Sequence, residues 1–320
     1  MWRYLGRRLL ISLPVLLGIT FFAFLFINLA PGDPVMVMIS PEQSSRLGSR
    51  WVDEQRARLG LDRPFLVRYA LWVGEVTRGN LGYSYRTQLP VTTMLAVRLG
   101  PTVELMGTAQ LLAIVVGVPL GMLGALHQYS WIDYAVTVLG FLVVCIPSFF
   151  LGLGLIYVLS INLGLFPTGG MADYGISSSL GNRLWHLVLP AFVLGMAQTA
   201  ALLRYARGSM LEVIRQDYIT TAKAKGLAAL RVTMRHALPN AAIPLITVVA
   251  LHVPLLVGGA VITEQVFRWP GMGQLALDSI QGRDYPVLMG INLLTAVLVL
   301  GGNLAADLLY ALVDPRIRYG

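Results

Sequence analysis

Long apolar runs without a charged residue alternate with polar segments along this chain of 320 residues. A helix needs about 20 apolar residues to cross the roughly 30 Å hydrocarbon layer of a membrane. Backbone polar groups in lipid need internal partners, which helices supply, whereas a transmembrane β-barrel shows shorter alternating segments. The pattern therefore predicts an all-α polytopic membrane protein with six transmembrane helices. The six runs are Leu9–Leu29, Leu105–Leu126, Tyr134–Ala172, Leu184–Leu203, Ala237–Thr263 and Tyr285–Ala306.

The polar segment of residues 30–101, between the first two runs, is long enough to fold on the outer side of the membrane. Trp51–Leu59 has acidic residues near its start and basic residues near its end, which suits the helix dipole and predicts a short helix. Phe65–Val76 predicts a second helix with aromatic residues at three-to-four spacing, and we interpret this stripe as packing rather than as a ligand contact. Because no internal repeat is present, residues 1–320 are predicted to form a single membrane domain.

Composition agrees with a membrane location. The chain is 56% hydrophobic and 12% charged, whereas soluble proteins contain about 25% charged residues. The first run follows three arginines, as a signal peptide would, but its uncharged core is longer than the roughly 7–15 residues typical of signals. We therefore expect a retained first span.

Basic residues predict the orientation of the spans. With both termini placed in the cytoplasm, the short inner segments contain 12 Lys and Arg residues and the short outer loops contain three. Such a bias follows the positive-inside rule, which largely ignores a long segment such as 30–101. A multi-pass protein of the cell (inner) membrane is predicted, and the net charge of +8 becomes a topology signal rather than a sign of nucleic-acid binding.

Motifs of catalysis and metal binding are missing from the sequence. The only lysines are Lys223 and Lys225, each preceded by alanine, so the chain has no Gly-Lys-Ser/Thr phosphate loop. No His-Glu-x-x-His, Gly-x-Ser-x-Gly or cluster with metal-ligand spacing occurs. We expect a non-catalytic chain that binds no metal and no cofactor of its own, so any ATP used in transport must be bound by another chain.

One basic segment between the fourth and fifth runs resembles a known motif. Asp217–Gly226 reads DYITTAKAKG and is followed by Leu238-Pro239. It resembles the cytoplasmic coupling loop of ABC-importer permeases, whose pattern is Glu-Ala-Ala, three residues, Gly, nine residues, Ile, one residue and Leu-Pro. Thr220-Thr221-Ala222 stands for Glu-Ala-Ala, Gly226 and Leu238-Pro239 match, and His236 replaces the Ile.

Other segments extend this resemblance over nearly the whole chain. They are RRLLISLPVLLGITFFAFLFINLAPGDP, LGLDRPFLVRYALWV with RGNLGYS, IPSFFLGLGLI, EQVFRWPGMGQLALDSIQGRDYPVL and NLAADLLYALVDPRIRYG. Together they resemble the B-type permease of the dipeptide/oligopeptide/nickel ABC importers. The resemblance implies the type I ABC importer permease fold, a second (C-type) permease, two ABC ATPase subunits that carry ATP and Mg²⁺, and an extracytoplasmic solute-binding protein.

The resemblance also implies candidate site residues. We expect the loop of residues 207–239 to dock on the ATPase through a short helix across Asp217–Gly226, with small side chains allowing close approach and Gly226 ending the helix. The alternative is a solvated basic loop retained for topology. The expected coupling residues are Asp217, Tyr218, Thr221, Ala222, Lys223, Ala224, Lys225 and Gly226.

Three further residues are candidates for the pathway or its outer gate. Glu104 lies at the outer end of the second run, where it could face an entering peptide or cation. Phe267 and Trp269 belong to a short outward aromatic segment, in which the alternative role of Trp269 is that of an interface anchor. Asp133 lies at the inner start of the third run, and His186 is interpreted as a packing or hydrogen-bonding residue rather than a metal ligand.

The function predicted from these observations is that of a permease subunit that forms a translocation pathway, within the membrane lipid, for peptides or related solutes. The alternative is a stand-alone secondary transporter or channel, which would normally carry charged residues at mid-depth. The middle thirds of the six runs contain none. Dipeptides, oligopeptides, glutathione and metal chelates all remain candidates for the solute.

Overall fold

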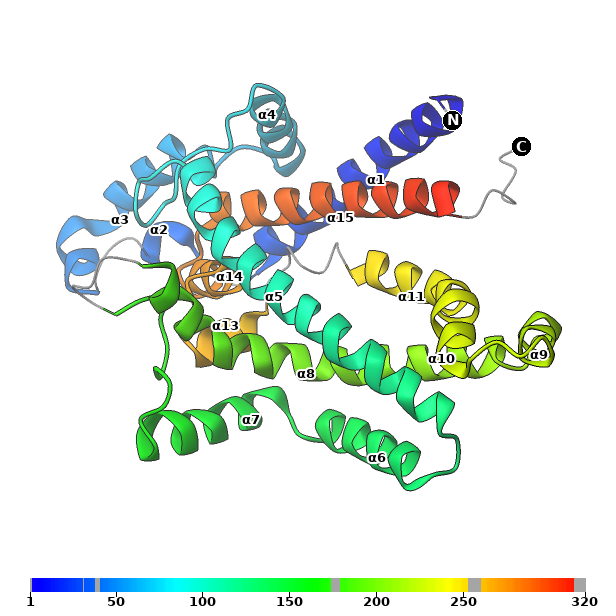
Figure 1. The fold of residues 1–320 in the computed structure, drawn as a ribbon. Helices are drawn as coiled ribbons and strands as arrows, with labels where there is room; N and C mark the ends of the chain where they lie inside the picture. The colour runs from blue at the N-terminus through cyan, green and yellow to red at the C-terminus, as the bar shows by residue number, and fades with distance from the viewer. Residues whose placement is uncertain (1, 31, 38–40, 174–178, 253–259, 314–320) are drawn as a thin grey trace. The chain divides into compact units, whose positions relative to one another are not determined.

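The computed structural model describes residues 2–30, 32–37, 41–173, 179–252 and 260–313, and regular structure in these ranges is helical (Figure 1). The only other pairing there is an isolated bridge between Tyr83 and Pro90. The elements are α1 (Trp2–Leu29), α2 (Pro34–Val37), α3 (Pro41–Arg58), α4 (Phe65–Thr77), α5 (Val91–Leu126), α6 (Trp131–Cys145), α7 (Ser148–Leu155), the π-helical η1 (Ile156–Asn162), α8 (Leu180–Val213), α9 (Asp217–Ala224), α10 (Ala229–Val232), η2 (Thr233–Ala237), α11 (Leu238–His252), α13 (Val261–Val266), α14 (Met272–Gln281) and α15 (Tyr285–Val313).

The chain divides into two compact units. Unit 1 contains residues 1–100 and 271–300, and unit 2 contains residues 101–270 and 301–318. Both boundaries within the helices fall at small residues, before Pro101 in α5 and before Gly301 in α15. The single domain predicted for residues 1–320 stays a prediction.

Within the described ranges, four helices are long and apolar enough to cross a membrane: α1, α5, α8 and α15. A fifth span arises if the pair of α6 and α7–η1, bent by 95°, is counted as one crossing. The bend has a local cause, because Ile146 is extended before Pro147, as the residue before a proline tends to be. The predicted run Ala237–Thr263 corresponds to α11 and α13, and its residues 253–259 lie outside the described part. The count of six therefore stays a prediction.

The centre of unit 2 is the contact between α5 and α8, where small residues bring the two backbones together. A Cβ on Gly117 of α5 would lie 2.8 Å from the Thr199 carbonyl oxygen of α8, and Gly121 is closer still to Leu203. Membrane helices use small residues in this way to approach closely. The contacts advance together along both helices, so α5 and α8 run in the same direction. The chain between them therefore returns to the end from which α5 starts, as the predicted topology also requires.

In unit 1, α4 packs on α1 through aromatic rings. Tyr69 stacks edge-on against Phe21 at 5.3 Å between centroids and donates its hydroxyl to the Leu17 carbonyl at 2.9 Å. Phe65 contacts the same ring of Phe21. The aromatic stripe of residues 65–76 is thus packing, as predicted. The predicted helix Trp51–Leu59 is the end of the longer helix α3.

A polar clamp in unit 1 fixes the loop that precedes α5. The buried Asp284 carboxylate accepts hydrogen bonds from the Ser84 hydroxyl and, at 3.0 Å, from the Tyr85 backbone N–H. Ser84 in turn accepts the N–H groups of Arg86 and Thr87 at 3.2 and 3.0 Å. The loop of residues 78–90 is therefore attached to the turn that starts α15.

Candidate functional site

The predicted coupling segment forms a short helix with a defined end. Helix α9 spans Asp217–Ala224, and Asp217 in its first turn suits the positive end of the helix dipole without acting as a side-chain cap. Gly226 has a φ of +76°, and its N–H donates to the Lys223 carbonyl while the Leu227 N–H donates to Ala222. These two hydrogen bonds form a Schellman motif, in which glycine takes the left-handed position.

One face of α9 is buried and the opposite face is exposed. Ile219 and Ala222, three residues apart, are 1% and 7% exposed, so they anchor the helix. The prediction that Ala222 belongs to the small outward surface is corrected here, because its position three residues after Ile219 places it on the inner face. The exposed coupling residues are Asp217, Tyr218, Thr221, Lys223, Ala224, Lys225 and Gly226.

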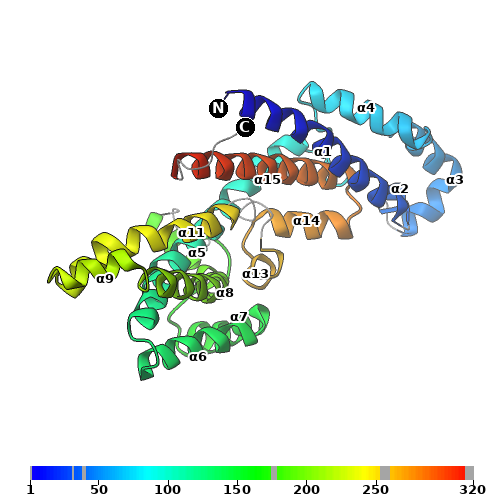
Figure 2. The ribbon, with the colours of Figure 1, turned by 90° about the vertical axis from the view of Figure 1, so that its right-hand side faces the viewer.

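The anchor of α9 reaches several helices of unit 2. Ile219 and Ala222 belong to one buried cluster, the α9 anchor cluster, whose other members are Met122, Ala125, Met210, Val232, Ala237 and Ala241. These residues come from α5, α8, α10, η2 and α11. Helix α9 therefore lies beside α10 at the C-terminal end of α8 (Figures 1 and 2), where an apolar contact joins it to both close-packed helices.

Glu104, a candidate pathway residue, lies in an ion pair. Its carboxylate accepts two hydrogen bonds at 2.8 and 2.7 Å from Nε of Arg183, and the Arg183 terminal nitrogen also contacts it. Arg183 is in the first turn of α8, whereas Glu104 is the fourteenth residue of α5, so the pair joins the N-terminal end of α8 to the N-terminal half of α5. Sequence reasoning named Glu104 but missed its partner, which lies 79 residues away.

Phe267 and Trp269, the candidate gate residues, are both buried inside unit 2, with exposures of 1% and 0%. The Trp269 indole N–H donates to the Pro101 carbonyl at 2.9 Å. The Phe267 carbonyl accepts the Gly170 N–H at 2.8 Å, which joins this segment to the loop after η1. Because Trp269 is fully buried, it lies in the interior of unit 2 instead of on a surface facing the membrane interface, and the Pro101 carbonyl satisfies its N–H.

Two other groups complete the polar contacts around α8. Asp133, with a side chain only 4% exposed, accepts hydrogen bonds from Arg207 Nε at 2.6 Å and its terminal nitrogen at 2.8 Å. His186 is buried and lies 3.1 Å from the Gly169 carbonyl and 3.3 Å from the Asp173 carboxylate. His186 is thus a hydrogen-bonding residue, as predicted.

Comparisons with known proteins identify the family. Residues 117–319 match the family described as the inner membrane component of binding-protein-dependent transport systems, and residues 1–106 match the N-terminal family of such membrane components. The chain belongs to this transport family.

Relatives of this transport component match it from end to end. It is 45% identical over 317 residues to the oligopeptide transport system permease protein AppB of Bacillus subtilis, with 99% of each chain covered. It is 38% identical over 345 residues to the dipeptide transport system permease protein DppB of Escherichia coli K12, with 100% of this chain and 99% of that protein covered.

Solved structures support the fold of the transport component. Inward-facing structures of the MetNI methionine ABC transporter match with a TM-score of 0.56. The first is 19% identical and covers 70% of this chain and 97% of the matched chain. The predicted type I ABC importer permease fold is confirmed.

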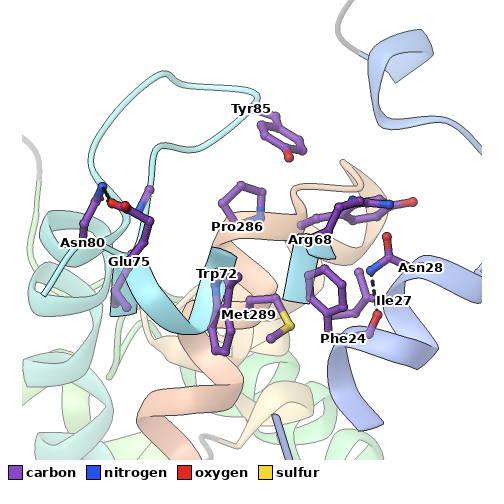
Figure 3. Close-up of a pocket in the computed structure, with 13 residues that line it drawn as sticks. Phe24, Ile27, Asn28, Arg68, Trp72, Glu75, Asn80, Tyr85, Pro286 and Met289 are labelled. Carbon is purple, nitrogen blue, oxygen red and sulfur yellow. Dashed lines mark hydrogen bonds between the residues drawn. The ribbon is translucent and has the colours of Figure 1, made fainter. Parts of the chain in front are cut away.

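Sequence reasoning did not anticipate a cavity of about 180 Å³ in unit 1 of the transport component (Figure 3). Phe24 and Asn28 of α1, Trp72 of α4 and Met289 of α15 line it, and the Arg68 guanidinium lies 5.7 Å from the Phe24 ring centroid. Burial raises the pKa of Tyr85, another lining residue, to about 12, so its hydroxyl stays protonated at neutral pH. The cavity is mostly apolar, and its charged lining residues are Arg68 and Glu75.

Proposed function

We propose that this chain is the permease subunit of an ATP-driven importer for peptides or related solutes. The observation that carries the proposal is the helix α9, which presents an exposed polar face while its apolar face is fixed in the α9 anchor cluster. The full-length similarity to relatives named as oligopeptide and dipeptide permeases supports the substrate class. Dipeptides and longer peptides are the favoured solutes.

Coupling to ATP hydrolysis is assigned to α9. In this proposal α9 is cytoplasmic, as are both chain termini, in agreement with the excess of basic residues in the short inner segments. Its outward face docks in a groove of an ABC ATPase, and Asp217, Thr221 and Ala224 share that face at helical spacing. A displacement of α9 then moves α5, α8 and α11 together, because the α9 anchor cluster joins them.

The outer residues have a supporting role in the proposal. The Glu104–Arg183 pair holds α5 against the outer end of α8, and Phe267 and Trp269 hold the gate segment in place. A peptide delivered by an extracytoplasmic solute-binding protein enters between this chain and a second, C-type permease. The two ATPase subunits bind ATP and Mg²⁺ and perform the hydrolysis, so this chain is not an enzyme.

A stand-alone transporter is less consistent with the ionic contacts of unit 2. Charged groups of a proton- or ion-coupled transporter are expected at mid-depth of the spans. The Glu104–Arg183 and Asp133–Arg207 pairs instead lie toward the two ends of α8. Both pairs are consistent with a framework that keeps helices in register.

The test is a bulky substitution on the exposed face of α9. Ala224→Trp adds volume where the ATPase is proposed to dock, without entering the buried face formed by Ile219 and Ala222. We expect the variant to fold and reach the membrane but to lose co-purification with the ATPase and stimulation of ATP hydrolysis by the peptide-loaded binding protein. The measurements are pull-down from membranes and ATPase assays in proteoliposomes.

Ala229→Trp is the matched control, because Ala229 is also exposed and starts the neighbouring helix α10. It should retain assembly and stimulation. If Ala224→Trp behaves like this control in both assays, α9 is not the coupling element. If ATP fails to drive peptide uptake by the intact wild-type complex, the importer assignment itself is wrong.

A further inference from the structure

A groove between α6 and α8 has no role in the proposed mechanism. Its cavity of about 240 Å³ is lined by Thr137, Gly140 and Phe141 of α6 and by Leu203, Arg204 and Arg207 of α8, followed by Gly208. The two helices pack against each other in unit 2 (Figure 1). The groove lies over the middle of α6 and the C-terminal third of α8. In the proposed orientation the C-terminal end of α8 is on the cytoplasmic side.

The two arginines in the groove differ in their partners. Arg207 is bound by Asp133 through two hydrogen bonds, which balance its charge. Arg204 is exposed and has no ion pair or hydrogen bond with any residue in the described part of the chain. Arg204 directly follows the apolar run Leu184–Leu203, so in the proposed orientation its cation lies at the cytoplasmic surface of the membrane, where acidic lipid headgroups are available as partners.

The groove has space and a second donor beside Arg204. A Cβ added at Gly208 would meet no atom within 4 Å, and one at Gly140 would only touch Leu203 at 3.9 Å. Thr137 is half-buried, and its hydroxyl has no hydrogen bond within the described residues. A guanidinium and a hydroxyl at an open cavity are suited to the oxygens of a phosphate group.

The surface around the groove is typical of contact with lipid. Phe141 and Leu142 are 55% and 54% exposed, and they continue an apolar surface along α6. Trp131 and Tyr134, at the start of the same helix, are 78% and 61% exposed, and such aromatic residues gather at membrane–water interfaces. A ligand in the groove would thus have acyl chains as neighbours on one side and the interface on the other.

We propose that the groove of α6 and α8 binds an anionic phospholipid, with the headgroup phosphate on Arg204 and Thr137 and an acyl chain along Phe141. Basic pockets between membrane helices on the cytoplasmic side are suited to acidic headgroups. The assignment of this lipid to the cytoplasmic leaflet rests on the orientation in the proposed function. The existence of the binding site rests only on the geometry of unit 2. The competing occupant of the groove is a surface of the second permease. It would have to place a carboxylate on Arg204 and cover the exposed apolar side chains of α6 with apolar side chains of its own.

The experiment measures lipid retained by the purified importer complex. Wild type and variants are reconstituted in nanodiscs of phosphatidylcholine and phosphatidylglycerol, extracted in mild detergent and analysed by native mass spectrometry. We expect the wild type to retain phosphatidylglycerol selectively and Arg204→Gln to retain about fivefold less. Arg215→Gln, which removes an exposed arginine outside the groove, should retain the wild-type amount.

Gly208→Leu is a second variant that fills the groove without changing its charge. It should also lower retention of phosphatidylglycerol, and added inorganic phosphate should not replace the lipid. Equal retention by wild type and both groove variants would overturn the proposal, as would loss of the second permease from Arg204→Gln with unchanged lipid. Because the measurement needs no transport, it is independent of whether peptides are the solute.

Discussion

The two ends of α8, outer at Arg183 and inner at Arg207 in the proposed orientation, differ in how the chain satisfies its polar groups. Arg183 and Arg207 are 24 positions apart, or about 36 Å along the helix, which is close to the thickness of a membrane. At the outer end the aromatic residues Phe267 and Trp269 are sealed inside, while the Glu104–Arg183 pair is 24% and 40% exposed. At the inner end the carboxylate of the ion pair is buried, while Arg204 and the outward face of α9 are open.

The difference indicates where other molecules act on this chain. The outer end is held by the chain's own apolar contacts, so it is a stable frame for the segment that contains Phe267 and Trp269. The inner end has its strong ionic contact inside and leaves charged and small side chains exposed. Assembly and lipid are therefore expected to act chiefly at the inner end, and substitutions should separate the two ends by the size and kind of their effect.

The largest effect is expected from Trp269→Ala at the outer end. Removing this fully buried side chain leaves a cavity among Leu105, Leu187 and Ala191 and should lower the free energy of unfolding by about 3–5 kcal/mol. Trp269→Phe keeps most of the volume but removes the hydrogen bond to the Pro101 carbonyl, so a loss of about 1 kcal/mol is expected. Thermal unfolding in detergent measures both. If both Trp269 variants lost the same small amount of unfolding free energy, the packing of Trp269 would not be what holds the outer end.

Arg207→Ala at the inner end should have the next largest effect. It leaves the buried Asp133 carboxylate without its counter-charge, and a loss of about 3 kcal/mol is expected. Arg207→Lys keeps the charge without the paired hydrogen bonds and should recover part of the loss. The same unfolding assay applies. A variant with Asp133 also replaced by Asn should be more stable than Arg207→Ala alone, and the reverse order would contradict a stabilising pair.

Glu104→Gln at the outer end should have the smallest effect. The amide keeps the shape of the side chain, and the partly exposed Arg183 regains water, so the expected loss is about 1 kcal/mol. High salt should weaken the wild-type pair as well and reduce the difference between the two proteins. A loss as large as that of Arg207→Ala would mean that the two ends do not differ in their ion pairs.

Much of the fold could be predicted from the sequence, because a membrane span requires a long run of apolar residues. The exceptions have physical causes. Helix α5 starts at Val91, well before the predicted Leu105, since charged residues end an apolar run without ending a helix. Tyr134–Ala172 was predicted as one span, but Pro147 divides it into two helices.

The candidate site was predictable where the signal was local. Gly226 ends α9, as predicted, and it does so in the left-handed conformation. The inward position of Ala222 could have been found from its spacing with Ile219. The partners of Glu104 and Asp133 could not, since Arg183 and Arg207 lie more than 70 residues away and only the packing of the helices brings them together.

The glycine contacts between α5 and α8 have a mechanical consequence. Where two backbones touch, no long side chain remains between them that could change rotamer and absorb a displacement. The two helices should therefore move as one rigid body, so that a displacement at one end of the pair produces a displacement of similar size at the other end. Substituting Gly121 by a larger residue would push Leu203 and the backbone of α8 away from α5. The two helices could then move relative to each other, and less of a displacement would be transmitted between their ends.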